Sequence, residues 1–175
     1  MIAKKICLIG DFGVGKTSLV RRYVESCFSD AYLSTVGVKI ARKTLEVRDR
    51  HQQLISLQLM LWDIEGSTKF KSISASYLQG AKGAIVVADA SRPENITHVN
   101  EHIHTFREIN PQGQLMVAIN KSDLIIKEDL VKIMQITAAL NQAKILGIYP
   151  TSAKTGENVD QLFQQLATAI IGISP

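Results

Sequence analysis

The order of apolar segments along the chain constrains its fold more than any other feature. Apolar runs of strand length, each bounded by Gly, Pro, Asn or Asp, lie at 6–9, 54–62, 83–88, 115–119 and 145–149. Segments with helical periodicity lie at 19–24, 96–106 and 159–170. This alternation predicts an α/β fold with a mostly parallel sheet and helices on both faces. A ligand of such a sheet binds at the carboxyl ends of the strands.

One edge of the sheet is expected to be antiparallel. Residues 38–47 have strand character and are separated from 54–62 by the polar segment 48–53, which favours a hairpin. The chain has 175 residues, of which 46% are apolar and 21% charged, and this composition excludes a disordered chain. No repeat or linker divides it, so we expect residues 1–175 to form a single domain.

Charge and cysteine content narrow the class of protein further. The net charge is +4, and the first 50 residues hold 10 Lys or Arg against 5 Asp or Glu. No aromatic residues are interleaved with these charges, so we expect a solvated strand face and no nucleic-acid partner. Cys7 and Cys27 are too few and too isolated for a disulfide framework. No segment has the pattern of a membrane span, signal peptide or lipid anchor, which predicts a cytoplasmic location.

A phosphate-binding motif directly follows the first predicted strand. Residues 10–17 read Gly-Asp-Phe-Gly-Val-Gly-Lys-Thr, a complete G-x-x-x-x-G-K-[ST] sequence that opens a helix. Backbone N–H groups of such a loop curl around phosphate oxygens, the lysine reaches the β- and γ-phosphates, and the threonine hydroxyl ligates Mg²⁺. The residues expected to contact phosphate or Mg²⁺ here are Gly13, Val14, Gly15, Lys16, Thr17 and Ser18.

A second motif indicates which base is bound. Asn120, Lys121, Ser122 and Asp123 follow the 115–119 strand, at the edge where a base would lie. A carboxylate at Asp123 would accept hydrogen bonds from N1–H and the N2 amino group of guanine, whereas adenine lacks this donor pair. Helix capping is the alternative role for Asp123. The order of the two motifs favours recognition of guanine over adenine.

Two further segments supply candidate Mg²⁺ ligands. Asp63 and Gly66 form a D-x-x-G motif at the end of the 54–62 strand, which places a carboxylate near a metal and a glycine N–H near a γ-phosphate. A simple strand-end turn is the alternative. Thr35 lies between the first helix and the hairpin, where its hydroxyl could complete the metal shell. The predicted Mg²⁺ ligands are therefore Thr17, Thr35 and Asp63, the last directly or through a water.

These motifs, together with Ser152, Ala153 and Lys154, resemble the small GTPases of the Ras superfamily, and the wording is most similar to the Rab branch. The Rab-like stretches cover nearly the whole chain and lie at 22–28, 35–38, 70–77, 80–87 and 151–159. The resemblance implies a P-loop G domain with a six-stranded sheet and one antiparallel edge strand. It also implies GTP or GDP and Mg²⁺ as cofactors.

The resemblance further implies roles for the residues around the base and partners for the protein. Phe28 would pack against guanine, Lys121 and Lys154 would flank the base, and the Ala153 N–H would meet the guanine oxygen. Switch segments 27–37 and 63–77 would bind effector proteins, and an exchange factor and an activating protein would act on them. We expect a monomer that reaches membranes only through partners.

Three positions around the γ-phosphate depart from the family pattern. Ser67 stands where the family has the glutamine that orients the attacking water, and a serine hydroxyl is too short for that role. Phe12 would crowd an arginine supplied by an activating protein. Glu65 is a candidate substitute for the glutamine, so Lys16, Gly66, Ser67 and Glu65 are the candidate catalytic residues. We expect a switch that hydrolyses GTP slowly; the alternative is a persistently GTP-bound scaffold with negligible hydrolysis.

Some residues suggest other chemistry. His98 and His102 have i, i+4 spacing on a predicted helix, but no Cys or carboxylate is expected to join them, so we predict a solvated helix surface rather than a metal site. His104 points to another face. Trp62 is either a partner-facing aromatic residue or strand packing, and we favour the partner role.

Overall fold

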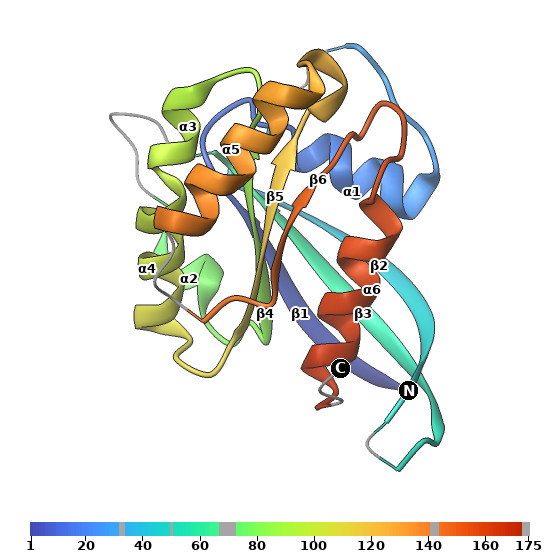
Figure 1. Cartoon of the computed structure of the whole chain (residues 1–175). Coiled ribbons are helices and arrows are strands. Elements are labelled where there is room, and N and C mark those ends of the chain that lie inside the picture. Colours follow the sequence, from blue (N-terminus) through green and yellow to red (C-terminus); the bar gives the residue numbers. More distant parts are fainter. Residues whose placement is uncertain (32–33, 50, 67–72, 141–143, 173–175) are drawn as a thin grey trace.

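The computed structural model of the chain describes residues 1–31, 34–49, 51–66, 73–140 and 144–172. Its sheet has the strand order β2-β3-β1-β4-β5-β6 (Figure 1). The strands are β1 (Ile2–Ile9), β2 (Val38–Arg48), β3 (Leu54–Ile64), β4 (Gly83–Asp89), β5 (Gln114–Asn120) and β6 (Gly147–Pro150). Only β2 is antiparallel to its neighbour, with Val38 opposite Ile64 and Arg48 opposite Leu54. The predicted fold class, including the antiparallel edge strand, is confirmed.

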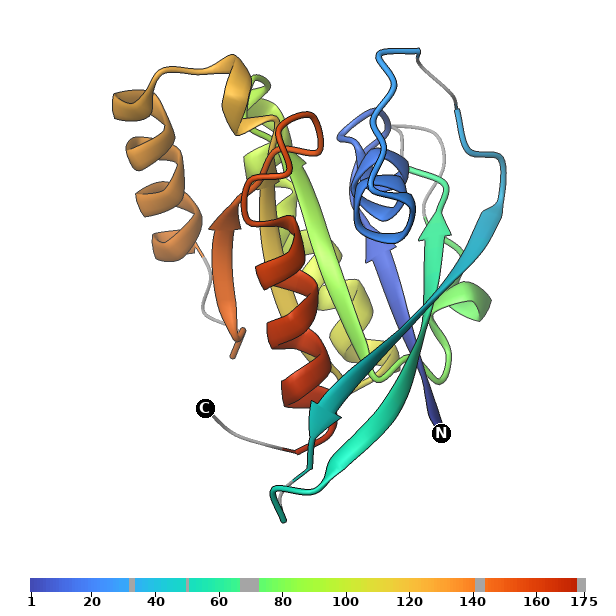
Figure 2. The same ribbon diagram turned by 90° about the vertical axis from the view of Figure 1, so that its right-hand side faces the viewer.

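Helices cover both faces of the sheet. They are α1 (Lys16–Glu25), α2 (Ala75–Leu78), α3 (Pro93–Thr97), α4 (Val99–Ile109), α5 (Lys127–Leu140) and α6 (Val159–Ile170), with a short 3-10 helix at Ser122–Leu124. Figures 1 and 2 show α1 and α6 on one face and the other helices on the opposite face. The chain therefore has three layers, as the alternation of its apolar segments predicts.

Each face of the sheet has its own apolar core. On one face Tyr23 of α1 stacks on Phe163 of α6, with ring centroids 4.1 Å apart and an interplanar angle of 7°. On the other face Ile103 and Phe106 of α4 pack against β4 and β5. All seven residues of β4 are buried, as expected for a central parallel strand with helices on both sides. The central strands are thereby held firmly, and their carboxyl ends provide a rigid base for the loops that follow.

The elements differ from the sequence predictions at a few points. Helix α5 is not predicted, and the helix expected over 96–106 is divided into α3 and α4, which meet at His98. Strand β1 begins at Ile2, because it pairs with β3 well before its apolar run starts. Strand β6 begins at Gly147, two residues after the start of the predicted run at 145–149. It ends at Pro150, and an edge strand tolerates proline there.

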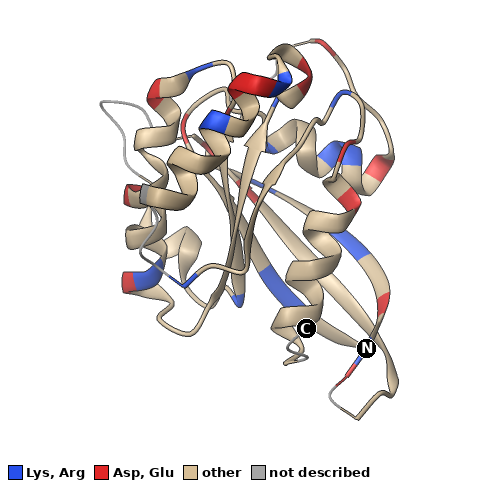
Figure 3. Ribbon diagram, in the orientation of Figure 1, with Lys and Arg blue, Asp and Glu red and all other residues tan. Residues whose placement is uncertain are grey.

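Six of the nine described basic residues among the first 50 lie on strands β1 and β2, where three are exposed and three are half-buried. Figure 3 shows Lys and Arg along β1 and β2. On β2, Lys39, Arg42 and Arg48 are exposed. This agrees with the predicted solvated strand face. Arg50, which belongs to the same basic group, lies outside the described residues.

Candidate functional site

The loop between β1 and α1 has a conformation that requires glycine. Gly10, Gly13 and Gly15 have φ of 148°, 75° and 99°. A Cβ atom at Gly10 would lie 2.2 Å from the Val87 carbonyl oxygen, and one at Gly15 would lie 2.3 Å from Nδ2 of Asn120. Side chains at these positions would both strain the backbone and collide with neighbouring strand ends. The loop is therefore packed against the ends of β4 and β5.

Lys16 lies beneath this loop, almost fully buried. Its ammonium group donates hydrogen bonds to the carbonyl oxygens of Gly10 at 3.1 Å and Asp11 at 2.9 Å. Burial lowers the pKa of Lys16 to about 8, although the nearby carboxylates of Asp63 and Asp11 oppose the shift. A cation held here attracts an anionic group above the loop.

Two more cations hold the next carbonyl groups of the loop. Arg92 donates to the Phe12 oxygen at 3.0 Å, and Lys121 donates to the Gly13 oxygen at 2.9 Å. Both cations also contact Oδ2 of Asp89, at 3.0 Å and 2.6 Å respectively. Burial opposes the shift, yet the hydrogen bonds led by the one from Lys121 lower the pKa of Asp89. The carbonyl groups of residues 10–13 are thus engaged from the protein side, and the N–H groups of such a loop are the usual contacts for an anion.

Three oxygen-bearing side chains converge beside the loop. The Thr17 hydroxyl lies 2.8 Å from the Thr35 hydroxyl and 2.6 Å from Oδ2 of Asp63, and the Thr35 hydroxyl lies 3.3 Å from the same Oδ2. Oδ1 of Asp63 is buried and has no hydrogen-bond partner among the residues described. Burial raises the pKa of Asp63, against the hydrogen bond from Thr17 and the charge of Lys16. An all-oxygen set with an unsatisfied carboxylate oxygen fits Mg²⁺.

Asn120 joins the phosphate-loop region to the loop after β6. Its Nδ2 donates to the Val14 carbonyl at 3.0 Å, and its Oδ1 accepts hydrogen bonds from the Ala153 N–H and the Thr151 hydroxyl, both at 3.3 Å. Asn120 is buried, so these contacts satisfy a polar side chain that could not remain unpaired. Asn120 therefore holds the phosphate loop and the loop after β6 next to each other, although they are more than 130 residues apart in sequence.

Asp123 follows Asn120 at the outer end of the site. Its Oδ1 accepts a hydrogen bond of 2.6 Å from the Ser152 hydroxyl, which itself accepts from the Thr155 N–H at 3.1 Å. Ser152 is buried whereas Asp123 is exposed. The serine therefore orients a carboxylate that faces the cavity.

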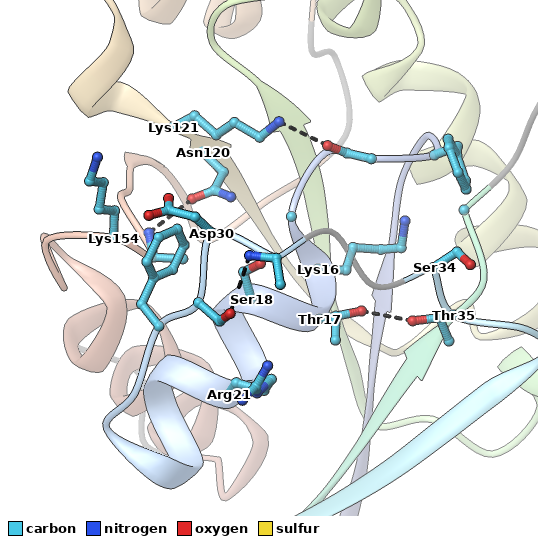
Figure 4. Close-up of a pocket in the computed structure, with 18 of the residues that line it drawn as sticks. Lys16, Thr17, Ser18, Arg21, Asp30, Ser34, Thr35, Asn120, Lys121 and Lys154 are labelled. Carbon is cyan, nitrogen blue, oxygen red and sulfur yellow. Dashed lines mark hydrogen bonds between the residues drawn. The ribbon is translucent and has the colours of Figure 1, made fainter.

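These side chains surround one cavity of about 280 Å³. The predicted residues that line it are Gly13, Gly15, Lys16, Thr17, Ser18, Phe28, Thr35, Gly66, Asn120, Lys121, Asp123, Ala153 and Lys154. In Figure 4, Asn120, Lys121 and Lys154 lie at one end of the cavity, and Lys16, Thr17 and Thr35 lie together at the other. The cavity is elongated, with amide, carboxylate and ammonium groups at one end and hydroxyl groups at the other.

Comparison with known proteins agrees with this geometry. A sequence profile described as "Ras family" matches residues 5–172. The protein Rab-13 of the dog, Canis lupus familiaris, described as Ras-related, is 32% identical over 168 residues, which cover 95% of this chain and 79% of Rab-13. This chain belongs to the Ras family. It is a Rab-like small GTPase, and family membership supports a switch that binds guanine nucleotide and hydrolyses GTP. The alternative of a scaffold without hydrolysis receives no support from it.

Some predicted residues of this Ras-family chain act from behind the cavity wall. Four predicted residues do not line the cavity: Val14, Asp63, Glu65 and Ser152. Three of them hydrogen-bond to residues that do line it. Val14 bonds to Asn120, Asp63 to Thr17, and Ser152 to Asp123. Ser67 lies outside the described residues. Conversely, Arg21, Cys27, Ser29, Asp30, Ala31, Ser34, Ile64 and Leu124 line the cavity without having been predicted from the sequence. Most of these are loop residues of common types, and no motif marks them.

Glu65 joins the two predicted switch segments of the GTPase. Its Oε2 accepts a hydrogen bond of 2.9 Å from the Gly37 N–H, and its own N–H donates to the Gly37 carbonyl at 2.8 Å. These contacts extend the β2–β3 ladder by one residue pair. The next residue, Gly66, lies so close to the phosphate loop that a Cβ atom there would be 2.4 Å from Cα of Phe12. The Phe12 side chain itself is 44% exposed.

The predicted solvated surface is wrong for His102, and the expectation that no carboxylate joins the two histidines is wrong as well. His102 is only 8% exposed, and both His98 and His102 bond to the carboxylate of Asp11, from the phosphate loop. The sequence shows the spacing of the two histidines but not the loop packed against them. His104 does point elsewhere and is exposed.

Trp62 is half-buried on β3 and packs against the core under α4. The ammonium group of Lys5 lies 3.7 Å from its ring centroid, and its indole N–H has no hydrogen-bond partner among the described residues. Packing against the core therefore explains why Trp62 is partly buried. The role of its ring in binding a partner stays a prediction. Within the described part of the chain, no helix is long and apolar enough to span a bilayer.

Proposed function

We propose that this Rab-like GTPase binds GDP or GTP together with Mg²⁺ in the 280 Å³ cavity and hydrolyses GTP slowly. The observation that carries this proposal is the convergence of three motifs on one cavity: the phosphate loop, the Thr17–Thr35–Asp63 oxygen cluster and the Asn120–Asp123 segment. Asn120 and Lys121 lie at one end of the cavity, and Lys16, Thr17 and Thr35 lie at the other, which suits a base at one end and a phosphate chain with its Mg²⁺ at the other (Figure 4). We further propose that residues 1–175 act as one domain.

The base lies, in this proposal, at the end of the cavity formed by Asp123, Lys121 and Ala153. Asp123, oriented by Ser152, accepts two hydrogen bonds from guanine, and the Ala153 N–H donates to the guanine oxygen. The stems of Lys121 and Lys154 flank the ring, and Phe28 packs against its edge. Asn120 acts indirectly, since both ends of its amide already hold the surrounding loops.

The phosphates lie over Lys16 and the N–H groups of residues 13–18. Thr17 and Thr35 would ligate Mg²⁺ through their hydroxyl groups, and Asp63 would do so directly or through a water. When bound, Mg²⁺ neutralises charge on the β- and γ-phosphates. Thr35 belongs to switch segment 27–37, so its contact with the other two residues ties this segment to the nucleotide state.

Slow hydrolysis is supported by the residues around the γ-phosphate. Ser67 cannot reach an attacking water as glutamine does. Glu65 was a candidate substitute, but its carboxylate is bonded to the Gly37 N–H, which favours a role in holding the switch segments together. Phe12 is 44% exposed, and in this proposal its ring would crowd an arginine that an activating protein inserts.

We propose partners of the usual family kinds. Effectors would bind switch segments 27–37 and 63–77, and an exchange factor and an activating protein would act on the same face. The protein would work as a monomer in the cytoplasm, at the periphery of membranes through these partners. Membership of the Ras family and the likeness to Rab-13 support the kinds of partner in this proposal.

The variant Asp123→Ala tests the assignment of the base site. Loss of the carboxylate leaves two guanine donors unpaired, so affinity for GDP and GTP should fall alike, by about 1–3 kcal/mol for each donor left unpaired. Titration calorimetry or displacement of a fluorescent GDP analogue measures the change. Asp129→Ala is the matched control, because this carboxylate is exposed on α5 and pairs only locally with Lys132. A GDP affinity for Asp123→Ala within about twofold of the control, less than one hydrogen bond, would refute the assignment.

A further inference from the structure

A side-chain cluster links the phosphate loop to α3 and α4. Oδ2 of Asp11 accepts hydrogen bonds from Nδ2 of Asn95 at 2.7 Å and from Nδ1 of His98 at 2.6 Å, and Oδ1 bonds to Nε2 of His102 at 2.8 Å. An ionised carboxylate only accepts hydrogen bonds, so each histidine must donate from the nitrogen that faces Asp11. Within the described part of the chain, the Asp11 carboxylate is thus held by Asn95 of α3, by His98 at the junction of α3 and α4, and by His102 of α4.

The cluster fixes the first half of the loop from two directions. The carbonyl oxygen of Asp11 is held by Lys16 from inside the site, while its carboxylate is held by the helices. The next carbonyl, that of Phe12, is held by Arg92 at the start of α3. A loop held in place before its ligand arrives loses less conformational freedom on binding.

The charges around the cluster favour its ionised form. Burial would raise the pKa of Asp11, but the hydrogen bonds from His102 and His98 dominate and hold it well below its ordinary value. The hydrogen bond to Asp11 raises the pKa of His98, and Glu101 of α4 and Glu94 of α3 act in the same direction. On the loop side the neighbouring cations are Lys16 and Arg92.

The sign of the pH dependence follows from these two shifts. Because the pKa of His98 is raised, the stabilisation that protonated His98 gives to the cluster is complete below the ordinary histidine pKa. This stabilisation is lost as the pH rises through the raised pKa. Because the pKa of Asp11 is lowered, the stabilisation that ionised Asp11 gives to the cluster is complete above the ordinary aspartate pKa. This stabilisation is lost only in stronger acid. The cluster is therefore strongest between about pH 4 and pH 6.5 and weakens toward pH 8.

We propose that Asp11 is a positioning residue which, held by Asn95, His98 and His102, keeps the phosphate loop in its nucleotide-binding form, and that protonation of His98 slows nucleotide release. The inference rests on the proposed nucleotide site. Release requires the loop to move off the phosphates, so an interaction that restrains the loop slows this step. Nucleotide exchange becomes a proton-sensitive process through residues that do not touch the nucleotide.

The test is the release rate of a fluorescent GDP analogue from the Mg²⁺-containing complex between pH 5.5 and 8.5. In the double variant His98→Asn, His102→Gln the amide nitrogens replace Nδ1 and Nε2 as uncharged donors. We expect wild-type release to slow by about two- to fivefold from pH 8 to pH 6 relative to this variant, the range of one partly exposed ion pair. Ionisation of the nucleotide affects both proteins equally and cancels in the ratio.

Further variants separate the cluster from other effects. Asp11→Asn should flatten the pH profile in the same way, and His98→Asn alone, at a position 44% exposed in its side chain, should remove part of the effect without disturbing the core. His104→Gln is the control, because the His104 side chain is 76% exposed and pairs with Glu108 of its own helix, away from Asp11, and this variant should keep the wild-type profile. Identical profiles in the wild type and all the cluster variants would overturn this inference. Absence of any GDP binding would instead overturn the proposed nucleotide site.

Discussion

Lys16 and Asp63 are buried charged residues whose pKa values move in opposite directions for one reason. Burial lowers the pKa of Lys16 to about 8 and raises that of Asp63, because removal from water disfavours either charge. Phosphate groups beside Lys16 and a divalent cation beside Asp63 would each supply the opposite charge. We therefore expect a bound nucleotide with Mg²⁺ to favour the ionised form of both residues.

The two cysteines should differ sharply in reactivity. Cys7 is fully buried in β1, and burial raises its pKa to about 12 despite the charge of Lys5, whereas Cys27 is partly exposed and lines the cavity. A thiol reagent at pH 8 should therefore label one cysteine of the native protein quickly and the second only after unfolding. GDP should slow the labelling of Cys27, and Cys27→Ser should abolish the fast phase. Equal labelling of both thiols, or no effect of GDP, would contradict these placements.

At the scale of elements, sequence patterns predict well where burial is one-sided or complete. The runs at 83–88 and 115–119 mark β4 and β5 because both faces of these strands are covered. Helix α5 has no clean apolar stripe, since Val131 and Ile136 are exposed between residues that pack on the sheet, and so its pattern is not diagnostic. The division of α3 from α4 at His98 likewise depends on tertiary contacts.

The segment that carries Thr35 should respond to the nucleotide. Thr35 reaches the Thr17–Asp63 cluster in this structure, and a γ-phosphate with Mg²⁺ should hold it there. Hydrogen exchange across switch segment 27–37 should be slower with a non-hydrolysable GTP analogue than with GDP. The variant Thr35→Ser keeps the hydroxyl and should keep the difference, whereas Thr35→Ala should lose it. Buried β4 serves as the internal reference, and equal exchange of segment 27–37 in both nucleotide states would show that it is not a switch.

At the scale of the whole molecule, the sheet explains why so much of the site could be predicted. Motifs that follow parallel strands must meet at one edge, so residues from the phosphate loop, Asp63 and Asn120 come together although they are far apart in sequence. The contact of Asp11 with His98 and His102 could not be predicted, because it depends on how α3 and α4 pack against the loop. Motif spacing carries no information on such packing.

The slow hydrolysis that we propose has two causes, one within the protein and one in its contact with an activating protein. Water positioning is internal and depends on position 67, whereas access for an arginine from an activating protein depends on Phe12. An inserted arginine is typically worth about 10³ to 10⁵ in rate, so only a variant that carries Ser67→Gln and also a small residue in place of Phe12 should respond fully to an activating protein. A full response of the wild type would contradict the role given to Phe12.

Single-turnover hydrolysis of GTP by the purified protein with Mg²⁺ tests the central claim most directly. The wild-type rate should be slow, and Ser67→Gln should raise it. Glu65→Ala should change the rate by no more than about twofold, which is less than the effect of one hydrogen bond. The reason is that the Glu65 carboxylate is bonded to the Gly37 N–H and is not expected to orient the attacking water. A wild-type rate that already equals that of Ser67→Gln and drops sharply in Glu65→Ala would contradict the account and make Glu65 the catalytic residue.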